Sequence, residues 1–208
     1  MPIWAYCNPW TVRLYCERVP KIVDVEQRRN EILYALWAVI HERGIEGVTY
    51  QAVAAEAGVS VGRVQHYFAT RDALVLAGAE GMVALSEAAH SDRVGTLDAA
   101  EALAALLAAP LPRTPAFRLG AAVWHAYLTR AVVDEAIAEV VRDAVVGTVH
   151  EVARLLAAAG GGGRDRNAEA LRLVALSDGL TQRVLLGVTD VADAAALLRG
   201  EVARATGG

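Results

Sequence analysis

One stretch, GIEGVTYQAVAAEAGVSVGRVQHYF at residues 44–68, constrains the fold of this chain more than any other. Thr49 stands directly before a run of good helix formers, where its hydroxyl can cap the first turn of a helix. Gly58 ends that run and supplies the backbone freedom that a tight turn requires. Ser60 then stands where it can cap a second helix. Two short capped helices joined by such a turn predict a helix-turn-helix.

The second helix of this motif offers a surface that suits recognition of DNA. Three valines are spaced to pack the two helices against each other: Val53, Val59 and Val64. Arg63 can pair bidentately with guanine and Gln65 with adenine, while Gly62 lets the backbone approach closely. We expect this helix to enter a major groove with its N-terminal end leading. The alternative is a plain structural bundle, and for Phe68 alone we expect a place in the core.

Helical patterns continue on both sides of the motif, and no segment predicts a β-strand. A first helix begins near Asp24 and ends at Gly44, and a fourth begins at Thr70. Four side chains of the first helix form one apolar stripe: Ile32, Leu36, Val39 and Ile40. Prolines and glycines then separate five further helices, near residues 97–109, 116–131, 134–159, 167–187 and 190–205. The sequence predicts an all-α fold of about nine helices, with a larger C-terminal helical domain after the helix-turn-helix.

Composition narrows the class of protein further. The chain is 55% hydrophobic and 21% charged, which is typical of a globular protein, and no apolar run is long enough to cross a membrane. Cys7 and Cys16 form neither a disulfide framework nor a metal cluster, so we expect a cytoplasmic protein without a metal site. The net charge of −4 gives no sign of a nucleic-acid partner, so DNA binding must rest on the local motif.

Motifs typical of enzymes are incomplete in this chain. The glycine run Gly160–Gly163 lacks the following Lys and Ser or Thr of a phosphate-binding loop. The pair His150 and Glu151 lacks the second histidine of a zinc protease motif. We therefore expect no catalytic activity and no cofactor, and an enzyme that uses a C-terminal pocket is kept only as an alternative.

Residues 19–80 resemble the DNA-binding domain of the TetR family of bacterial repressors. The resemblance is carried by RRNEILYALWAVIHERG in the first helix, by TYQAVAAEAGVS in the turn and by FATRDALV after the motif. It implies that seven residues face DNA: Thr49, Tyr50, Ser60, Arg63, His66, Tyr67 and Arg71. Of these, Thr49, Tyr67 and Arg71 would mainly contact phosphates. Val61, Gly62 and Gln65 complete the predicted DNA-binding set.

This sequence departs from the family pattern at three of those positions. Many members have a small hydroxyl residue in place of Arg63, a tyrosine in place of Gln65 and a lysine in place of Arg71. The fold and the entry into the groove are expected to survive these changes. An operator sequence cannot be transferred from another member.

The C-terminal part, residues 92–208, resembles the family in its architecture. Residues 171–187 look like the eighth helix of members that sense small organic ligands. The resemblance implies a homodimer through the last two helices, for which six side chains supply apolar faces: Leu173, Leu176, Leu180, Val184, Leu197 and Leu198. We expect a DNA-binding domain over residues 19–72 and a ligand-binding and dimerisation domain over residues 73–208.

An effector pocket needs an apolar lining with a few polar groups that orient the ligand. The candidates are the larger or polar side chains of the C-terminal helices: Phe117, Trp124, His125, Tyr127, His150, Asp178 and Gln182. Each has a structural alternative. The aromatic residues could be ordinary core, the histidines could be on the surface, and the pair Asp178 and Gln182 could bond across a dimer interface.

The function implied by the resemblance is that of a ligand-released repressor. A dimer would bind a palindromic operator in double-stranded DNA, and a small organic effector would favour a conformation whose recognition helices no longer match the groove. The long helix after Thr70 is the expected lever. The alternatives are a transcriptional activator and a ligand-independent regulator with the same DNA-binding domain.

Residues 1–18 do not resemble the rest of the chain. Residues 19–24 read VPKIVD, close to the MPKIVD with which family members often begin. One hypothesis is therefore that translation begins at a GTG codon for Val19, which would make residues 1–18 a mis-assigned extension. The alternative is a genuine N-terminal arm that touches the minor groove.

Overall fold

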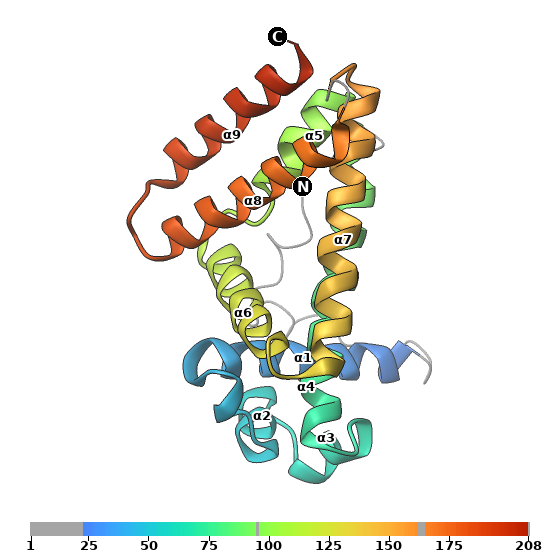
Figure 1. The fold of residues 1–208 in the computed structure, drawn as a ribbon. Coiled ribbons are helices and arrows are strands. Elements are labelled where there is room, and N and C mark those ends of the chain that lie inside the picture. Colours follow the sequence, from blue (N-terminus) through green and yellow to red (C-terminus); the bar gives the residue numbers. More distant parts are fainter. Residues whose placement is uncertain (1–22, 95, 162–164, 208) are drawn as a thin grey trace. The chain divides into compact units, whose positions relative to one another are not determined.

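The computed structural model describes residues 23–94, 96–161 and 165–207. Over these ranges the chain forms nine α-helices, one short 3-10 helix and no strand (Figure 1). The predicted all-α fold is confirmed. The N-terminal extension of residues 1–18 and the proposed start at Val19 lie outside the described residues.

The chain divides into two compact units. Unit 1 contains the residues up to Ala84 together with 123–138, and unit 2 contains 85–122 together with 139–208. The boundary predicted after residue 72 follows the end of the helix-turn-helix motif. Unit 1 is larger than the DNA-binding domain predicted over residues 19–72, because the following helix and the segment 123–138 contribute to its core.

The helix-turn-helix lies in unit 1. Its elements are α1 (Val23–Arg43), η3 (Ile45–Gly47), α2 (Tyr50–Ala57) and α3 (Val61–Tyr67), and α4 (Arg71–Val94) follows. The two predicted caps are confirmed: Thr49 Oγ1 accepts from the Ala52 amide at 3.1 Å, and Ser60 Oγ accepts from the Arg63 amide at 3.3 Å. Gly58 has φ of 65°, the left-handed conformation that the turn between α2 and α3 requires. The 3-10 helix η3 was not predicted.

The core of unit 1 joins α1, α4 and α6 (Pro115–Ala131). The four residues of the predicted stripe on α1 are buried: Ile32, Leu36, Val39 and Ile40. Trp37 Nε1 donates to the backbone carbonyl of Gly78 at 3.1 Å, and the Tyr127 hydroxyl donates to the carbonyl of Val75 at 3.0 Å. The segment 123–138 is therefore an integral part of the unit that carries the helix-turn-helix.

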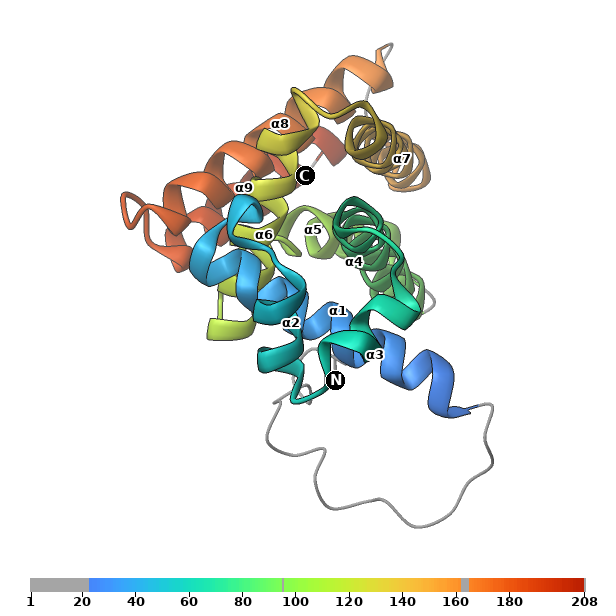
Figure 2. The ribbon, with the colours of Figure 1, turned by 90° about the horizontal axis from the view of Figure 1, so that it is seen from below.

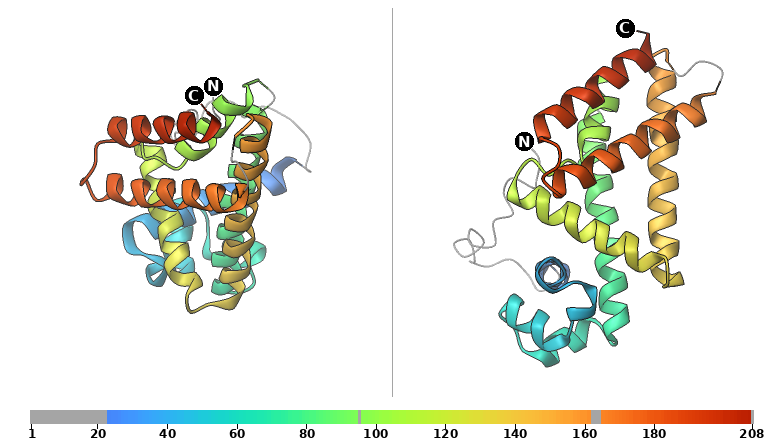
Figure 3. Two further views of the ribbon diagram at one scale, coloured as in Figure 1. Left: turned by 45° about the horizontal axis from the view of Figure 1, so that its top comes forward. Right: turned by 60° about the vertical axis from the view of Figure 1, so that its left-hand side comes forward.

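Unit 2 contains α5 (Ala99–Ala108), α8 (Arg166–Leu185), α9 (Val191–Thr206) and most of α7 (Glu135–Ala158). Three aspartates, Asp98, Asp165 and Asp190, cap α5, α8 and α9 by accepting backbone N–H bonds. Helices α8 and α9 run side by side in opposite directions, and α5 contacts both of them (Figure 3). Leucines and valines from α5, α7, α8 and α9 form the core of this unit.

The helix bounds predicted from proline and glycine breaks agree with the structure within about two residues. Across the described part of the chain, no helix combines the length and the apolar composition that crossing a membrane requires.

Candidate nucleic-acid interface

Helix α3 is held by one apolar side and presents a polar side to solvent. Val64 and the adjoining Phe68 are buried, at 0% and 4% exposure, as predicted for Phe68. The opposite side carries four exposed residues: Gly62, Arg63, Gln65 and His66. Helices α2 and α3 adjoin each other at the end of unit 1 that faces the viewer in Figure 2. The residues predicted to read bases are therefore exposed, on a helix that its buried side chains hold in place.

The capping residues before α2 and α3 keep their hydroxyl groups at the surface. The hydroxyl oxygens of Thr49 and Ser60 accept backbone N–H bonds, and their hydroxyl hydrogens stay available for donation. Both residues are exposed, and Val61 is half-buried. A hydroxyl that caps a helix and donates outward can bind a phosphate oxygen of DNA.

Two of the predicted DNA-facing residues also bind within the protein. The Tyr50 hydroxyl donates to the carbonyl of Phe68 at 2.9 Å and so ties the start of α2 to the end of α3. Arg71 donates through Nε to the carbonyl of Val48 at 2.8 Å and through an Nη to that of Ile45 at 2.6 Å. These bonds fix the turn before α2. The sequence did not predict this internal role of Arg71.

The C-terminal end of α3 carries two adjoining aromatic rings. His66 and Tyr67 meet edge to face with 5.4 Å between their ring centroids. His66 is exposed and Tyr67 is half-buried, so the tyrosine presents only part of its ring to solvent.

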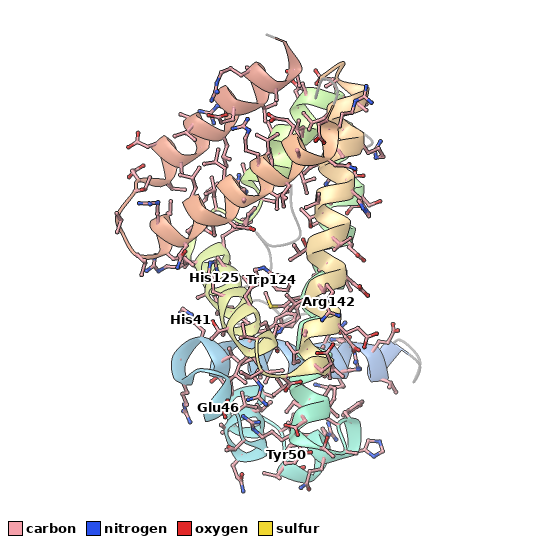
Figure 4. All side chains as sticks on the ribbon, in the orientation of Figure 1. His41, Glu46, Tyr50, Trp124, His125 and Arg142 are labelled. Carbon is pink, nitrogen blue, oxygen red and sulfur yellow. The ribbon has the colours of Figure 1, made fainter. Side chains whose placement is uncertain are left out.

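The predicted effector residues fall into both units. Phe117, His150, Asp178 and Gln182 belong to unit 2, whereas Trp124, His125 and Tyr127 belong to unit 1. Trp124 and His125 are half-buried on successive positions of α6 (Figure 4), and Phe117 is half-buried with the Arg113 guanidinium 4.9 Å from its ring centroid. His150, Asp178 and Gln182 are exposed. Tyr127 is fully buried, and burial raises its pKa.

Two polar side chains that were not predicted from the sequence face the interior of unit 2. Ser177 Oγ donates to the carbonyl of Leu107 at 2.6 Å, and Thr181 Oγ1 is buried with no hydrogen-bond partner among the described residues. Ser177 directly precedes the predicted Asp178, and Thr181 directly precedes the predicted Gln182. Helical spacing places them on one face of α8 with Leu173, Leu180 and Val184, and the structure shows that this face is the buried one.

The apolar face predicted for dimerisation needs a correction. Leu173, Leu180, Val184 and Leu198 are buried in the core of unit 2, so these four are not free for a partner, and the partly buried Leu176 packs against that core. Leu197 is 46% exposed. The large apolar side chain that α8 exposes is a different one, Leu171, at 58%.

A capped helix-turn-helix with an exposed recognition helix, joined to a larger helical unit, is the architecture of a DNA-binding transcriptional regulator. The comparisons with known proteins identify the family. Residues 32–77 match the model of the bacterial regulatory proteins of the tetR family, and residues 99–207 match the model of the BetI-type transcriptional repressor C-terminal domain. The chain belongs to the TetR family of transcriptional regulators.

Individual relatives agree with this assignment. A 57-residue segment is 49% identical to the HTH-type transcriptional regulator PksA of Bacillus subtilis, and it spans 27% of this chain and 28% of PksA. A putative TetR-family regulator from Rhodococcus is 26% identical, with a TM-score of 0.76 over 87% of this chain and 99% of that one. A putative regulator from Saccharomonospora viridis, solved in complex with choline, shares the fold at 24% identity, with a TM-score of 0.75 over 86% of this chain and 95% of that one.

Proposed function

We propose that this protein is a ligand-responsive repressor that binds a palindromic operator as a dimer and leaves it when a small organic effector binds. The observation that carries the proposal is the exposed side of α3, where Arg63, Gln65 and His66 stand opposite the buried Val64 and Phe68. Such a helix can read base edges in a major groove. A regulator of this kind acts in the cytoplasm, where the chromosome lies.

The proposed DNA contacts divide by the chemistry of the side chains. Arg63, Gln65 and His66 would contact base edges, while Thr49, Ser60 and the other capping or flanking residues would contact the sugar-phosphate backbone. The full proposed set is Thr49, Tyr50, Ser60, Val61, Gly62, Arg63, Gln65, His66, Tyr67 and Arg71. Tyr50 and Arg71 would act mainly by fixing the motif, since their polar atoms already bind backbone carbonyls.

A dimer would form through the exposed sides of α8 and α9. Helix α8 exposes Leu171 and Ala175, and α9 exposes Ala196, Leu197 and Gly200, all apolar or small. Small residues let two helices approach closely, and a two-fold axis through this face would make a four-helix contact. A symmetric dimer would then present two copies of α3 to half-sites about one helical turn of DNA apart, or a multiple of it.

The effector would bind in the helical unit that the BetI-type model matches. Thr181 is the polar group best suited to orient it, because its hydroxyl is buried and lacks a partner. Phe117, His150, Asp178 and Gln182 belong to the same unit as Thr181 and would contribute further contacts. Trp124 and His125 of unit 1 are separate proposals, whereas the Tyr127 hydroxyl is already bonded to the carbonyl of Val75. Binding would shift the dimer between two conformations with a coupling on the order of 1–3 kcal/mol. Helix α4 would transmit the change, since it contributes residues to both units.

The test is a footprint of the purified protein on the DNA upstream of its own gene, with a salt titration. We expect a protected near-palindrome and an affinity that falls steeply with salt. Arg63→Ala should abolish the protection, and Arg154→Ala, which removes an arginine from α7, should not. Weak binding without sequence preference on every fragment would contradict the repressor function.

A further inference from the structure

Few charged side chains near the recognition helix are available to bind the phosphates of DNA. The guanidinium of Arg71 donates hydrogen bonds to the carbonyls of Ile45 and Val48 and to the carboxylate of Asp72. Specific binding of DNA nevertheless requires cations along the backbone, and the motif has few of them. Another cationic side chain of unit 1 is therefore needed for contacts with the phosphates.

Helices α1 to α3 carry four arginines in the described part of the chain. Arg28 pairs with Glu31 at 2.7 Å, and Arg43 lies 4.0 Å from the carboxylate of Glu42. For the other two, Arg29 and Arg63, the structure of the described residues records no carboxylate within that distance. Arg63 belongs to the recognition surface already described, and Arg29 is an additional cation of the same kind.

Arg29 lies against the end of the recognition helix. Its guanidinium carbon is 5.4 Å from the centroid of the Phe68 ring, and Phe68 directly follows α3. The carbonyl of Phe68 accepts the hydrogen bond from Tyr50, so the end of α3, the start of α2 and Arg29 meet at this one residue. Figure 2 shows the first half of α1, in blue, beside α3.

The contact with the Phe68 ring leaves the guanidinium N–H groups without an acceptor among the described residues. An arginine over an aromatic face is attracted by the ring, while its N–H groups point outward within the guanidinium plane. Arg29 is half-buried, so part of the side chain reaches solvent. A planar cation with free donors in a fixed position is suited to a phosphate oxygen pair.

We propose that Arg29 is a phosphate-binding residue of α1 that contacts the DNA backbone beside the bases read by α3. The inference rests on the proposed DNA binding. It adds a contact from outside the helix-turn-helix motif, and it makes Phe68 the support that positions this contact. The contact would strengthen binding to all sequences alike and would not select bases.

The competing role for Arg29 is a structural one, in which it only covers the Phe68 ring. Salt distinguishes the two roles. A lost phosphate contact makes the dependence of log K on log salt less steep by about 0.9 per contact, whereas lost packing lowers affinity without changing that slope.

The experiment uses Arg29→Gln, Arg29→Lys and the control Arg28→Gln, which removes the neighbouring charge that Glu31 already pairs. Binding to the footprinted fragment and to a scrambled duplex of equal length is measured by fluorescence anisotropy between 50 and 200 mM KCl. Arg29→Gln should lower the slope by about 0.9 per bound chain on both duplexes, so that its deficit is about 3.5-fold larger at 50 mM than at 200 mM for one chain and about 12-fold larger for a dimer. Arg29→Lys and Arg28→Gln should keep the wild-type slope.

Thermal unfolding of each variant checks the fold. If Arg29→Gln lowers Tm, Arg29→Met, which keeps an unbranched apolar stem over Phe68, should show the same loss of slope. If Arg29→Gln and Arg29→Met both keep the wild-type salt dependence of log K, the phosphate role of Arg29 is overturned and the repressor function is left intact. A wild-type protein that binds neither duplex would overturn both.

Discussion

The hydroxyl of Tyr127 on α6 donates a hydrogen bond to the backbone carbonyl of Val75 on α4, and Gly78 makes this approach possible. A Cβ atom at position 78 would lie closer than 3.0 Å to both the Tyr127 hydroxyl and the Leu36 side chain. The position therefore has no room for a side chain. The segment 123–138 is joined to α1 and α4 at this point within unit 1.

Gly78→Ala should destabilise the protein by about 1–3 kcal/mol, because the added methyl group overpacks this junction. Tyr127→Phe should lower the free energy of unfolding by about 0.5–1.5 kcal/mol through the lost hydrogen bond. The double variant should lose less than the sum, since removal of the hydroxyl relieves one of the two clashes. Thermal and urea unfolding measure these changes.

Gly147→Ala on α7 is the matched control, because a Cβ there meets no other atom within 4 Å. It should raise stability slightly, as alanine is the better helix former. Strict additivity of Gly78→Ala and Tyr127→Phe would contradict the close packing described.

Thr181→Val and Ser177→Ala, one helical turn apart on α8, should change stability in opposite directions. The valine removes a buried hydroxyl that has no partner, so the free energy of unfolding should rise by about 1 kcal/mol. The alanine removes the bond to the Leu107 carbonyl, so stability should fall by about 0.5–1.5 kcal/mol. Urea unfolding of both variants is the measurement. A destabilising Thr181→Val would show that the hydroxyl is bonded in the unliganded protein.

Leu171→Arg and Leu197→Arg should convert the proposed dimer into a monomer. Both side chains are exposed in the single chain, so the substitutions should leave the fold intact while placing like charges at the proposed two-fold contact. Light scattering after size exclusion gives the mass. Val132→Arg, at a residue that is 83% exposed in the turn between α6 and α7, is the control and should not change it. A dimer that persists in both leucine variants would place the interface elsewhere.

Stability should fall in acid through the group of His90, Glu151 and Arg154 in unit 2. Arg154 hydrogen-bonds Glu151, and with the further bond from His90 it lowers the pKa of this carboxyl from 4.5 to about 2. A carboxyl whose folded pKa is depressed stabilises the protein above its unfolded pKa. That contribution should be lost as the pH falls from about 4.5 to about 2.

Urea unfolding across that pH range tests this expectation. Glu151→Gln should flatten the fall in stability, and Arg154→Gln should do so in part, because the arginine is the largest cause of the shift. An unchanged pH dependence in Glu151→Gln would show that other carboxyls account for the acid lability.

The helices of this protein and the face of its recognition helix could be predicted from local residues. A capping hydroxyl at Thr49 or Ser60 and a left-handed glycine at Gly58 act within a few residues of the chain. The side that buries Val64 and Phe68 follows from helical spacing, and the opposite side with Arg63 is then exposed.

For the leucines of α8 and α9, local residues do not predict which side chains are buried. Both helices are apolar on more than one side, so sequence spacing does not tell which side packs in the core of the chain and which stays exposed. Leu198 is buried and the adjacent Leu197 is exposed because α5 covers only one side of the pair. For the same reason the sequence predicts Asp178 and Gln182 as polar pocket residues, whereas the structure buries Ser177 and Thr181.

The sequence by itself therefore determined the all-helical fold, the helix-turn-helix with its caps, and the residues that its recognition helix exposes, because these depend on interactions between near neighbours. Only the tertiary structure decided that Arg71 binds the carbonyls before α2, that Tyr127 is core, and that Arg29 lies at the end of α3. Each of these joins residues more than 20 positions apart, and such contacts exist only once the helices have packed.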